Sequence, residues 1–233
     1  MPSTTRSMKG VIAYYDACPH CGKELKHVDV NLFGKTYSVG CWASCGCAEA
    51  LAEDAGVTDQ TKPYFMAGIP DRYLDAACDM GGNERDVLNG RSLYVTGPNG
   101  AGKTYYACSV ARCAVDCGRT VYFTSSVALI QAIRETYDGI RNGVLDRAYG
   151  CDVLVLDDLG KENPTRNALE VLFMLVDQRY ADRKPTVVTS NYSRGELADR
   201  WDSVDASVSA SIVSRLCEDS NLVVLNGRDR RLA

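Results

Sequence analysis

The sequence predicts an α/β fold in which a parallel sheet is flanked by helices and preceded by a small cysteine-rich domain. Three observations predict it. A glycine-rich loop separates an apolar run from a helical pattern, apolar strands and amphipathic helices alternate after that loop, and two cysteine clusters lie at residues 18–21 and 41–47. With 233 residues, of which 45% are hydrophobic, the chain is long enough to bury one large core beside a small appendage.

The glycine-rich loop carries the clearest motif of the chain. Its residues are Gly97, Pro98, Asn99, Gly100, Ala101, Gly102, Lys103 and Thr104, which fit the phosphate-binding pattern G-x-x-x-x-G-K-[ST]. A strand is expected at 92–96 and a helix at 105–117, as the motif requires. Loop amides at a helix N-terminus bind phosphate oxygens, Lys103 reaches the β- and γ-phosphates, and the Thr104 hydroxyl binds Mg²⁺. The loop therefore predicts a nucleoside triphosphate site.

A second strand at 120–124, a helix at 127–137 and a continuous apolar run at 151–159 extend the pattern. The third segment ends in Asp157 and Asp158. A strand buried on both faces is continuously apolar, and its carboxyl end lies where open α/β sheets bind ligands. We expect Asp157 to hold Mg²⁺ through its water shell and Asp158 to polarise the attacking water. The alternative is a solvated strand end.

Another apolar strand, at 185–191, ends in Asn191. If the helix at 168–180 leads this strand between the strand of the phosphate loop and the strand of the carboxylates, Asn191 comes within reach of the γ-phosphate and the water. Arg215 follows on an expected helix, and 222–225 is the last expected strand.

The N-terminal cysteines predict a zinc-binding domain over residues 1–60, before a domain at 61–233. The preferred ligands are Cys18, Cys21, Cys45 and Cys47, with Cys41 or His27 as substitutes, because two turns that each carry two thiolates can give tetrahedral geometry. A β-hairpin is expected at 28–39, a helix at 48–55 and a linker at 56–63. The alternative is buried free thiols or redox chemistry.

Two further segments leave alternatives open. Ile69 and Tyr73 either lie against a nucleotide base or belong to an ordinary turn. The hydroxyls of Thr124, Ser125 and Ser126 either contact phosphates or cap a helix.

Composition limits the functions that the chain can have. The net charge is −4 and the pI is near 5.3, so nucleic-acid contact requires a local patch or a pore assembled from several subunits. No apolar run approaches the ~18 residues of a membrane span, and no signal peptide is visible, so we expect a cytoplasmic protein without a membrane partner. Cysteines outside the two clusters are expected to be buried thiols.

Six motifs follow one another in order: Gly-Ile-Pro-x-Arg-Tyr, GPNGAGKT, VLVLDDLG, TVVTSN, SRL and a terminal G-x-D-x-R. Over residues 67–233 the chain thus resembles the DnaC/DnaI helicase loaders and the IstB transposition helpers, a branch of the AAA-plus ATPases. The resemblance implies an AAA-plus P-loop sheet with a truncated lid, Mg²⁺-dependent ATP hydrolysis and a homo-oligomer with ATP at subunit interfaces. Asn191 corresponds to sensor one, Arg215 to the arginine finger and Arg231 to a sensor-two-like arginine. Most AAA-plus proteins have Glu at the position of Asp158, whereas the loader branch commonly has Asp.

Within this branch, loaders often carry a zinc-binding N-terminal domain that engages the replicative helicase. The resemblance therefore implies an ATP-dependent loader of a hexameric, DnaB-type helicase onto single-stranded DNA. The alternative is an IstB-like ATPase that assists a transposase. A small-molecule P-loop kinase would need an acceptor pocket with its own base and arginines, which the sequence does not reveal. A pure interaction module, with ATP as a structural switch, also stays open.

Overall fold

The computed structural model describes residues 27–32, 35–40, 61–78, 80–137, 143–162 and 165–226. The chain divides into two compact units, residues 1–66 and 67–233. In the first unit, β1 (His27–Leu32) and β2 (Lys35–Gly40) form an antiparallel hairpin with Val30 opposite Tyr37. The hairpin expected at 28–39 is therefore confirmed. Helix α2 (Lys62–Met66) takes up the end of the expected linker. The helix expected at 48–55 lies outside the described residues.

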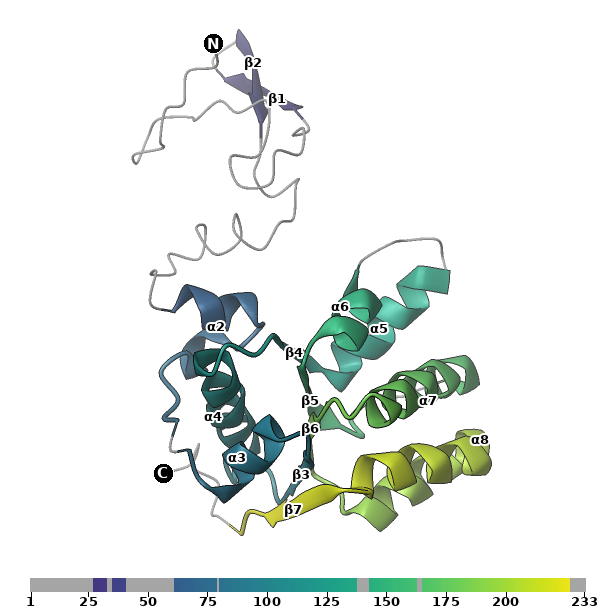
Figure 1. Ribbon diagram of the computed structural model, residues 1–233. Coiled ribbons are helices and arrows are strands. Elements are labelled where there is room, and N and C mark those ends of the chain that lie inside the picture. Colours follow the sequence, from purple (N-terminus) through teal and green to yellow (C-terminus); the bar gives the residue numbers. More distant parts are fainter. Residues whose placement is uncertain are drawn as a thin grey trace. The chain divides into compact units, whose positions relative to one another are not determined.

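The second unit contains a five-stranded sheet whose paired strands are all parallel, in the order β4-β5-β6-β3-β7 (Figure 1). The strands are β3 (Ser92–Thr96), β4 (Val121–Ser125), β5 (Val153–Leu159), β6 (Thr186–Ser190) and β7 (Ser220–Val224). Strand β6 lies between β3 and β5, where Val187 pairs with both Leu93 and Val155. The expected insertion of this strand between the loop strand and the carboxylate strand is confirmed.

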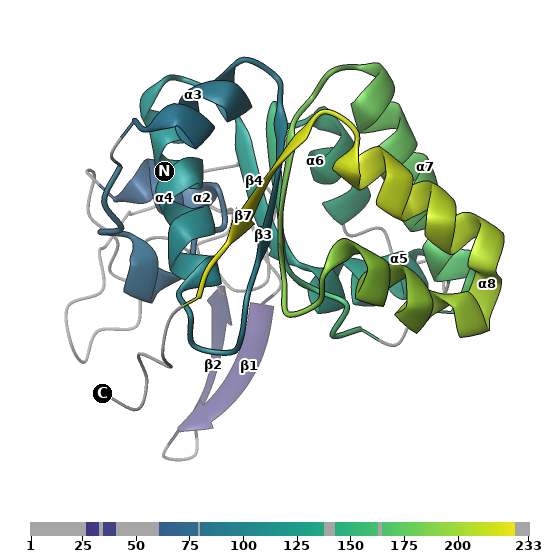
Figure 2. The same cartoon turned by 90° about the horizontal axis from the view of Figure 1, so that it is seen from below.

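Helices cover both faces of the sheet. They are η2 (Asp71–Tyr73), α3 (Gly82–Leu88), α4 (Lys103–Asp116), α5 (Ser126–Tyr137), α6 (Val144–Gly150), α7 (Arg166–Ala181) and α8 (Arg194–Cys217). Figure 2 shows α3 and α4 on one face and α5 to α8 on the other. Helices α3 and α6 were not predicted, because seven residues are too few to establish a helical period. Helix α8 kinks at Asp205, where φ is −163° and ψ is 101°.

The central strands are apolar because both of their faces are covered. Leu154 and Leu156 of β5 are fully buried in one core with Trp201 of α8, and Val155 between them is also fully buried. Covering both faces removes the polar positions that alternate in a one-sided sheet.

One buried cation fixes the amino-terminal ends of the strands. Arg179 of α7 is 1% exposed, and its guanidinium donates to the carbonyl oxygens of Ala148, Cys151 and Pro185 at 2.8–2.9 Å. Burial lowers the pKa of Arg179. These bonds tie α7 to the starts of β5 and β6 and leave the opposite edge of the sheet for ligands.

Two features of the described residues bear on the sequence expectations. Cys78 and Cys113 form a disulfide, so these two cysteines are not the free thiols that composition suggests.

Within the described ranges, no helix is long and apolar enough to cross a membrane.

Candidate nucleotide-binding site

The phosphate loop joins β3 to α4, as predicted. Gly97 has φ 151°, and a Cβ there would collide with the carbonyl oxygen of Leu225. Gly102, which caps α4, has φ 96°. Only glycine adopts such conformations readily, so both positions require it. The first turn of α4 begins at this loop, and backbone N–H groups at a helix N-terminus can bind an anion.

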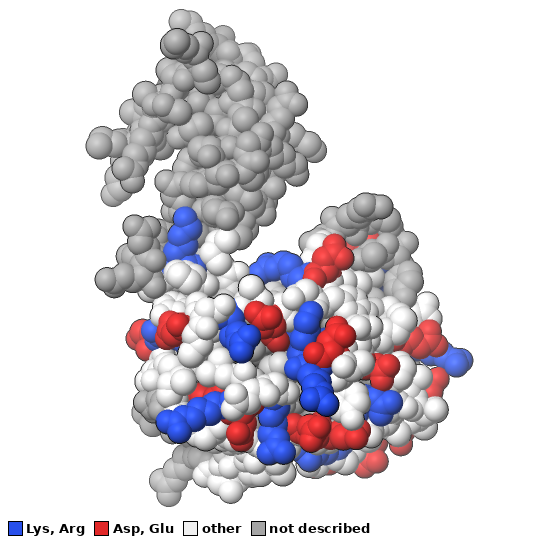
Figure 3. Space-filling model, viewed as in Figure 1, with Lys and Arg blue, Asp and Glu red and all other residues white. Residues whose placement is uncertain are grey.

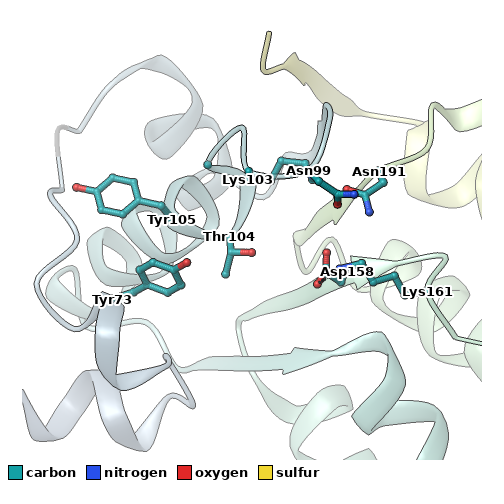
Figure 4. Close-up of a pocket in the computed structure, with 10 residues that line it drawn as sticks. Tyr73, Asn99, Lys103, Thr104, Tyr105, Asp158, Lys161 and Asn191 are labelled. Atoms are coloured by element: carbon teal, nitrogen blue, oxygen red, sulfur yellow. Dashed lines mark hydrogen bonds and ion pairs between the residues drawn. The ribbon is translucent and has the colours of Figure 1, made fainter. Parts of the chain in front are cut away.

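A pocket of about 210 Å³ opens at this loop (Figure 4). It is lined by Tyr73, Asn99, Gly100, Gly102, Lys103, Thr104, Tyr105, Asp158, Lys161 and Asn191. The pocket thus brings together the phosphate loop, the carboxyl ends of β5 and β6, and η2. Seven predicted site residues from three motifs meet in it: Asn99, Gly100, Gly102, Lys103, Thr104, Asp158 and Asn191.

Lys103 is held over the loop. Its side chain is buried, and Nζ donates to the carbonyl oxygens of Gly97 and Pro98, both at 2.8 Å. The amine is therefore fixed at the loop rim, beside the place where the loop amides can bind phosphate.

Asp157 forms an oxygen-only cluster with two hydroxyl groups. Thr104 Oγ1 donates to the Asp157 carboxylate, 3.1 Å from Oδ1, and Thr189 Oγ1 donates to Oδ1 at 2.7 Å. Burial raises the pKa of Asp157, and the bonds from Thr189 and Thr104 oppose this rise. Carboxylate and hydroxyl oxygens are ligands that suit Mg²⁺, so Thr104 and Asp157 fit the metal. Bound Mg²⁺ would offset the negative charge of the phosphate oxygens.

Asp158 projects into the pocket because β5 is irregular at its end. The β5–β6 register shifts between Leu156 and Leu159, and Asp158 has φ 58°, in the left-handed region. Its N–H donates to Thr189 Oγ1 at 2.8 Å, so Thr189 holds both carboxylate residues. Bulges next to active sites often redirect a side chain in this way. Thr189 was not predicted, although it lies within the motif TVVTSN.

Asn191 reaches the pocket from the end of β6, as predicted. Its Oδ1 is buried and has no hydrogen-bond partner among the described residues. A buried polar atom without a protein partner is uncommon, and here it faces a pocket that can hold a polar ligand or water.

One wall of the pocket is aromatic. The rings of Tyr73 and Tyr105 lie 6.2 Å apart in an edge-on arrangement, and the Tyr105 hydroxyl accepts a hydrogen bond from the N–H of Ala77 at 3.2 Å. Ile69 is 2% exposed and does not line the pocket. Of the two residues considered for base contact, Tyr73 lies at the site and Ile69 belongs to the core.

A buried glutamate supports the turn that follows Asp158. Glu162 is 4% exposed and accepts hydrogen bonds from Ser126 Oγ at 2.6 Å, Gly160 N at 2.9 Å and Trp201 Nε1 at 3.1 Å. Neither Glu162 nor the pocket residue Lys161 was predicted. Their proximity in the chain to the carboxylates was the only available signal.

Several predicted residues lie elsewhere. Arg215 of α8 does not line the pocket; its Nε donates to Asp177 Oδ1 at 2.7 Å. Ser125 Oγ accepts the N–H of Ala128 at the start of α5, so the capping alternative holds for Ser125. Arg231, the cysteines preferred as zinc ligands and Cys41 lie outside the described residues, and His27 begins β1.

Comparisons with known proteins agree with this site. The family model described as "IstB-like ATP binding protein" matches residues 86–233. The insertion sequence IS1162 putative ATP-binding protein of Pseudomonas fluorescens is 31% identical over 47% of this chain and 50% of its own length. This chain spans about half the length of the curated relatives it matches.

Solved structures share the fold. The crystal structure of the DnaC helicase loader has a TM-score of 0.56 and 26% identity, covering 67% of this chain and 100% of that chain. The structure of DnaI has a TM-score of 0.59 and 24% identity, covering 70% and 94%. The five-stranded parallel sheet is thus that of the AAA-plus ATPase domain. The family match covers more than half of the chain and includes the phosphate loop and both carboxylates, so the chain belongs to the IstB-like ATP binding proteins, in the DnaC/IstB branch of AAA-plus.

Proposed function

We propose that this protein is an ATP-dependent loader of a hexameric replicative helicase onto single-stranded DNA. The observation that carries the proposal is the likeness to the DnaC helicase loader, which extends over 100% of that chain at 26% identity. The pocket adds residues that an ATP-driven loader needs, since the loop, Asp158 and Asn191 meet there and Thr104 of the loop donates to Asp157.

In this proposal the chain hydrolyses ATP. Lys103 and the loop amides bind the phosphates, and Thr104 and Asp157 hold Mg²⁺. Asp158 accepts a proton from the attacking water, and Asn191 orients that water or the γ-phosphate. Positioning and electrostatics supply most of the catalysis of phosphoryl transfer, which suits a site built of fixed donors and carboxylates.

The proposal includes a homo-oligomer with ATP at subunit interfaces. Arg215 is held on the outside of α7 by Asp177, and its guanidinium lies 5.3 Å from the centre of the Tyr180 ring. An arginine held away from its own pocket suits a finger that acts on the nucleotide of a neighbouring subunit. Arg231, as a sensor-two-like residue, rests on the terminal motif alone.

Single-stranded DNA would bind to the assembled oligomer rather than to a broad basic face of one subunit. On the face seen in Figure 3, Lys and Arg are interspersed with Asp and Glu, and no large area carries one sign. The net charge of −4 points the same way.

The N-terminal unit would provide the contact with the helicase. Its proposed Zn²⁺ site, Cys18, Cys21, Cys45 and Cys47, rests on the spacing of the two clusters. A cytoplasmic location follows from this function.

The second candidate is an ATPase helper of a transposase. It is favoured by the family description and by the insertion-sequence relative that is 31% identical. The same pocket would serve both functions, so the ATP site does not discriminate between them.

DNA preference and partner identity together test the proposal. ATP turnover is measured with single-stranded and duplex DNA of equal length, and partners are captured from host extract with the full chain. The loader requires stimulation by single strands and a replicative helicase among the captured proteins. Stimulation by duplex DNA, with a transposase captured instead, would replace the loader by the second candidate.

A further inference from the structure

Lys161 lies in the nucleotide pocket beside Asp158, at the turn that follows β5 (Figure 4). Its Nζ is 2.7 Å from Asp158 Oδ2, and the two side chains are 44% and 31% exposed. The same carboxylate would have to accept the proton of the attacking water. The ion pair with Lys161 therefore engages the Asp158 carboxylate, which the proposed hydrolysis requires as a proton acceptor.

The backbone of this turn is fixed, so the side chain of Lys161 is the part that can move. The N–H of Lys161 donates to the carbonyl oxygen of Asp158 at 3.2 Å. The next residue, Glu162, accepts the N–H of Gly160 and is itself held by Trp201. Lys161 is thus presented at a constant position relative to the end of β5.

The ion pair itself is easily broken. Pairs between partly exposed residues three positions apart contribute little to stability, because solvent screens them and ordering the side chains costs entropy. A terminal phosphate carries more negative charge than one carboxylate and offers several acceptor oxygens. A triphosphate bound at the loop would therefore compete for the Lys161 amine.

We propose that Lys161 is a catalytic residue that recognises the γ-phosphate of ATP. Its amine pairs with Asp158 when the pocket holds no terminal phosphate, and binds the γ-phosphate when ATP enters, which frees Asp158. ADP lacks this phosphate and leaves the pair in place. The inference rests on the proposed ATP hydrolysis, and it does not depend on whether the partner is a helicase or a transposase.

The reaction assigned to the freed Asp158 is hydrolysis. The water oxygen forms a bond to the γ-phosphorus, and the bond from that phosphorus to the bridging oxygen breaks. The bridging oxygen leaves with the electron pair as part of ADP. The water proton passes to Asp158 and then to solvent. Lys161 offsets the charge of the γ-phosphate oxygens during this step.

The test compares the affinities for ADP and for a non-hydrolysable ATP analogue. For Lys161→Ala we expect affinity for the analogue to fall about tenfold, the usual scale of one charge-assisted contact, with ADP affinity unchanged. Lys161→Arg should keep most of the preference for the triphosphate. Asp158→Asn removes the competing charge, so it should strengthen analogue binding, and adding Lys161→Ala should abolish that gain.

Lys184→Ala is the matched control, since Lys184 lies at the opposite edge of the sheet and its Nζ donates to the carbonyl oxygen of Tyr149. It should leave both affinities unchanged. If Lys161→Ala lowers the affinities for ADP and for the analogue equally, or leaves both affinities unchanged, the inference is wrong. If Lys161→Ala instead speeds up ATP turnover and leaves the affinity for the analogue unchanged, Lys161 only inhibits Asp158 and does not contact the γ-phosphate. That result would also contradict the inference. If the parent protein binds both nucleotides but does not hydrolyse ATP, the proposed ATPase activity is wrong. The ratio of the two affinities would still show whether Lys161 contacts the γ-phosphate.

Discussion

Arg215 Nε donates to Asp177 Oδ1 across the contact between α8 and α7, at 2.7 Å. The Tyr180 ring lies on the same guanidinium, 5.3 Å from ring centre to carbon. Both contacts come from α7, and Arg215 does not line the nucleotide pocket. The Arg215 side chain is 35% exposed, so in the proposed oligomer it would be accessible to a neighbouring subunit.

Arg215→Ala should bind ATP normally and lose roughly 10³ to 10⁵ in turnover, the scale known for arginine fingers. Lys103→Ala should be inactive because it cannot hold the phosphates. A mixture of the two variants should recover partial activity, since an intact site on the Arg215→Ala subunit can receive Arg215 from a Lys103→Ala neighbour. Steady-state turnover at several mixing ratios measures this.

The control for the mixture is cross-linking that shows mixed oligomers under the same conditions. If mixed oligomers form and turnover stays at the level of the separate variants, Arg215 does not act in trans.

Lys103 and Asp158 should separate nucleotide binding from hydrolysis. Lys103→Ala removes the charge held at the loop and should weaken ATP binding by at least about tenfold. Asp158→Asn should retain ATP and reduce turnover by about 10² to 10⁴, the usual contribution of a general base. Nucleotide titration and single-turnover hydrolysis measure the two effects. Parent-like turnover in Asp158→Asn would exclude Asp158 from the reaction.

Asp157→Asn should raise the melting temperature at neutral pH when no magnesium is added. Because burial raises the pKa of Asp157, the folded protein holds this proton more tightly than the unfolded chain does. The ionised carboxylate therefore costs stability above the folded pKa, and this cost disappears as pH falls to the unfolded value of about 4. The gain from Asp157→Asn should shrink over the same range, as thermal melts at a series of pH values would show.

Asp152→Asn is the opposite-sign control. Hydrogen bonds from the backbone and side chain of Thr120 lower the pKa of Asp152, so its carboxylate stabilises the fold above the unfolded pKa. This variant should lose stability at neutral pH. If both variants lose stability, the ionised carboxylate of Asp157 does not destabilise the folded protein.

Much of the fold could be predicted because its strands are short and apolar, and because several of them are followed directly by a recognisable motif. The position of β6 between β3 and β5 was considered because it would bring Asn191 to the loop, and the pairing of Val187 with Leu93 and Val155 shows that position. Helices α3 and α6 were missed because each is seven residues long. Of helix α8, only the C-terminal segment around Arg215 was predicted, and the kink at Asp205 interrupts the helical period.

Site residues that belong to a sequence motif could be predicted. Residues whose role depends on contacts in the folded structure could not. Lys103, Asp158 and Asn191 came from motifs and meet in the pocket. Thr189 holds two carboxylates only because of the irregular end of β5, which no pattern reveals. The disulfide between Cys78 and Cys113 joins residues 35 positions apart, a pairing that spacing alone does not specify.

Removing zinc should unfold residues 1–60 and leave the ATPase unit folded. A structural zinc can contribute about 10–16 kcal/mol to a domain too small for its own core. Helicase binding should fail first, while nucleotide binding persists. Elemental analysis of freshly purified protein, with thiol titration before and after chelation, measures this. Protein that contains no zinc and whose N-terminal cysteines all titrate in the native state would end the zinc assignment.

Helicase loading onto a closed circle of single-stranded DNA tests the central claim most directly. A hexameric helicase cannot thread onto a circle without an opening step, so retention on the circle reports loading. We expect the full chain with Mg²⁺ and ATP to transfer the host replicative helicase onto the circle, as gel filtration would show, and Lys103→Ala to transfer none. If the full chain hydrolyses ATP in the same sample and the helicase stays off the circle, the protein is not a loader of that helicase.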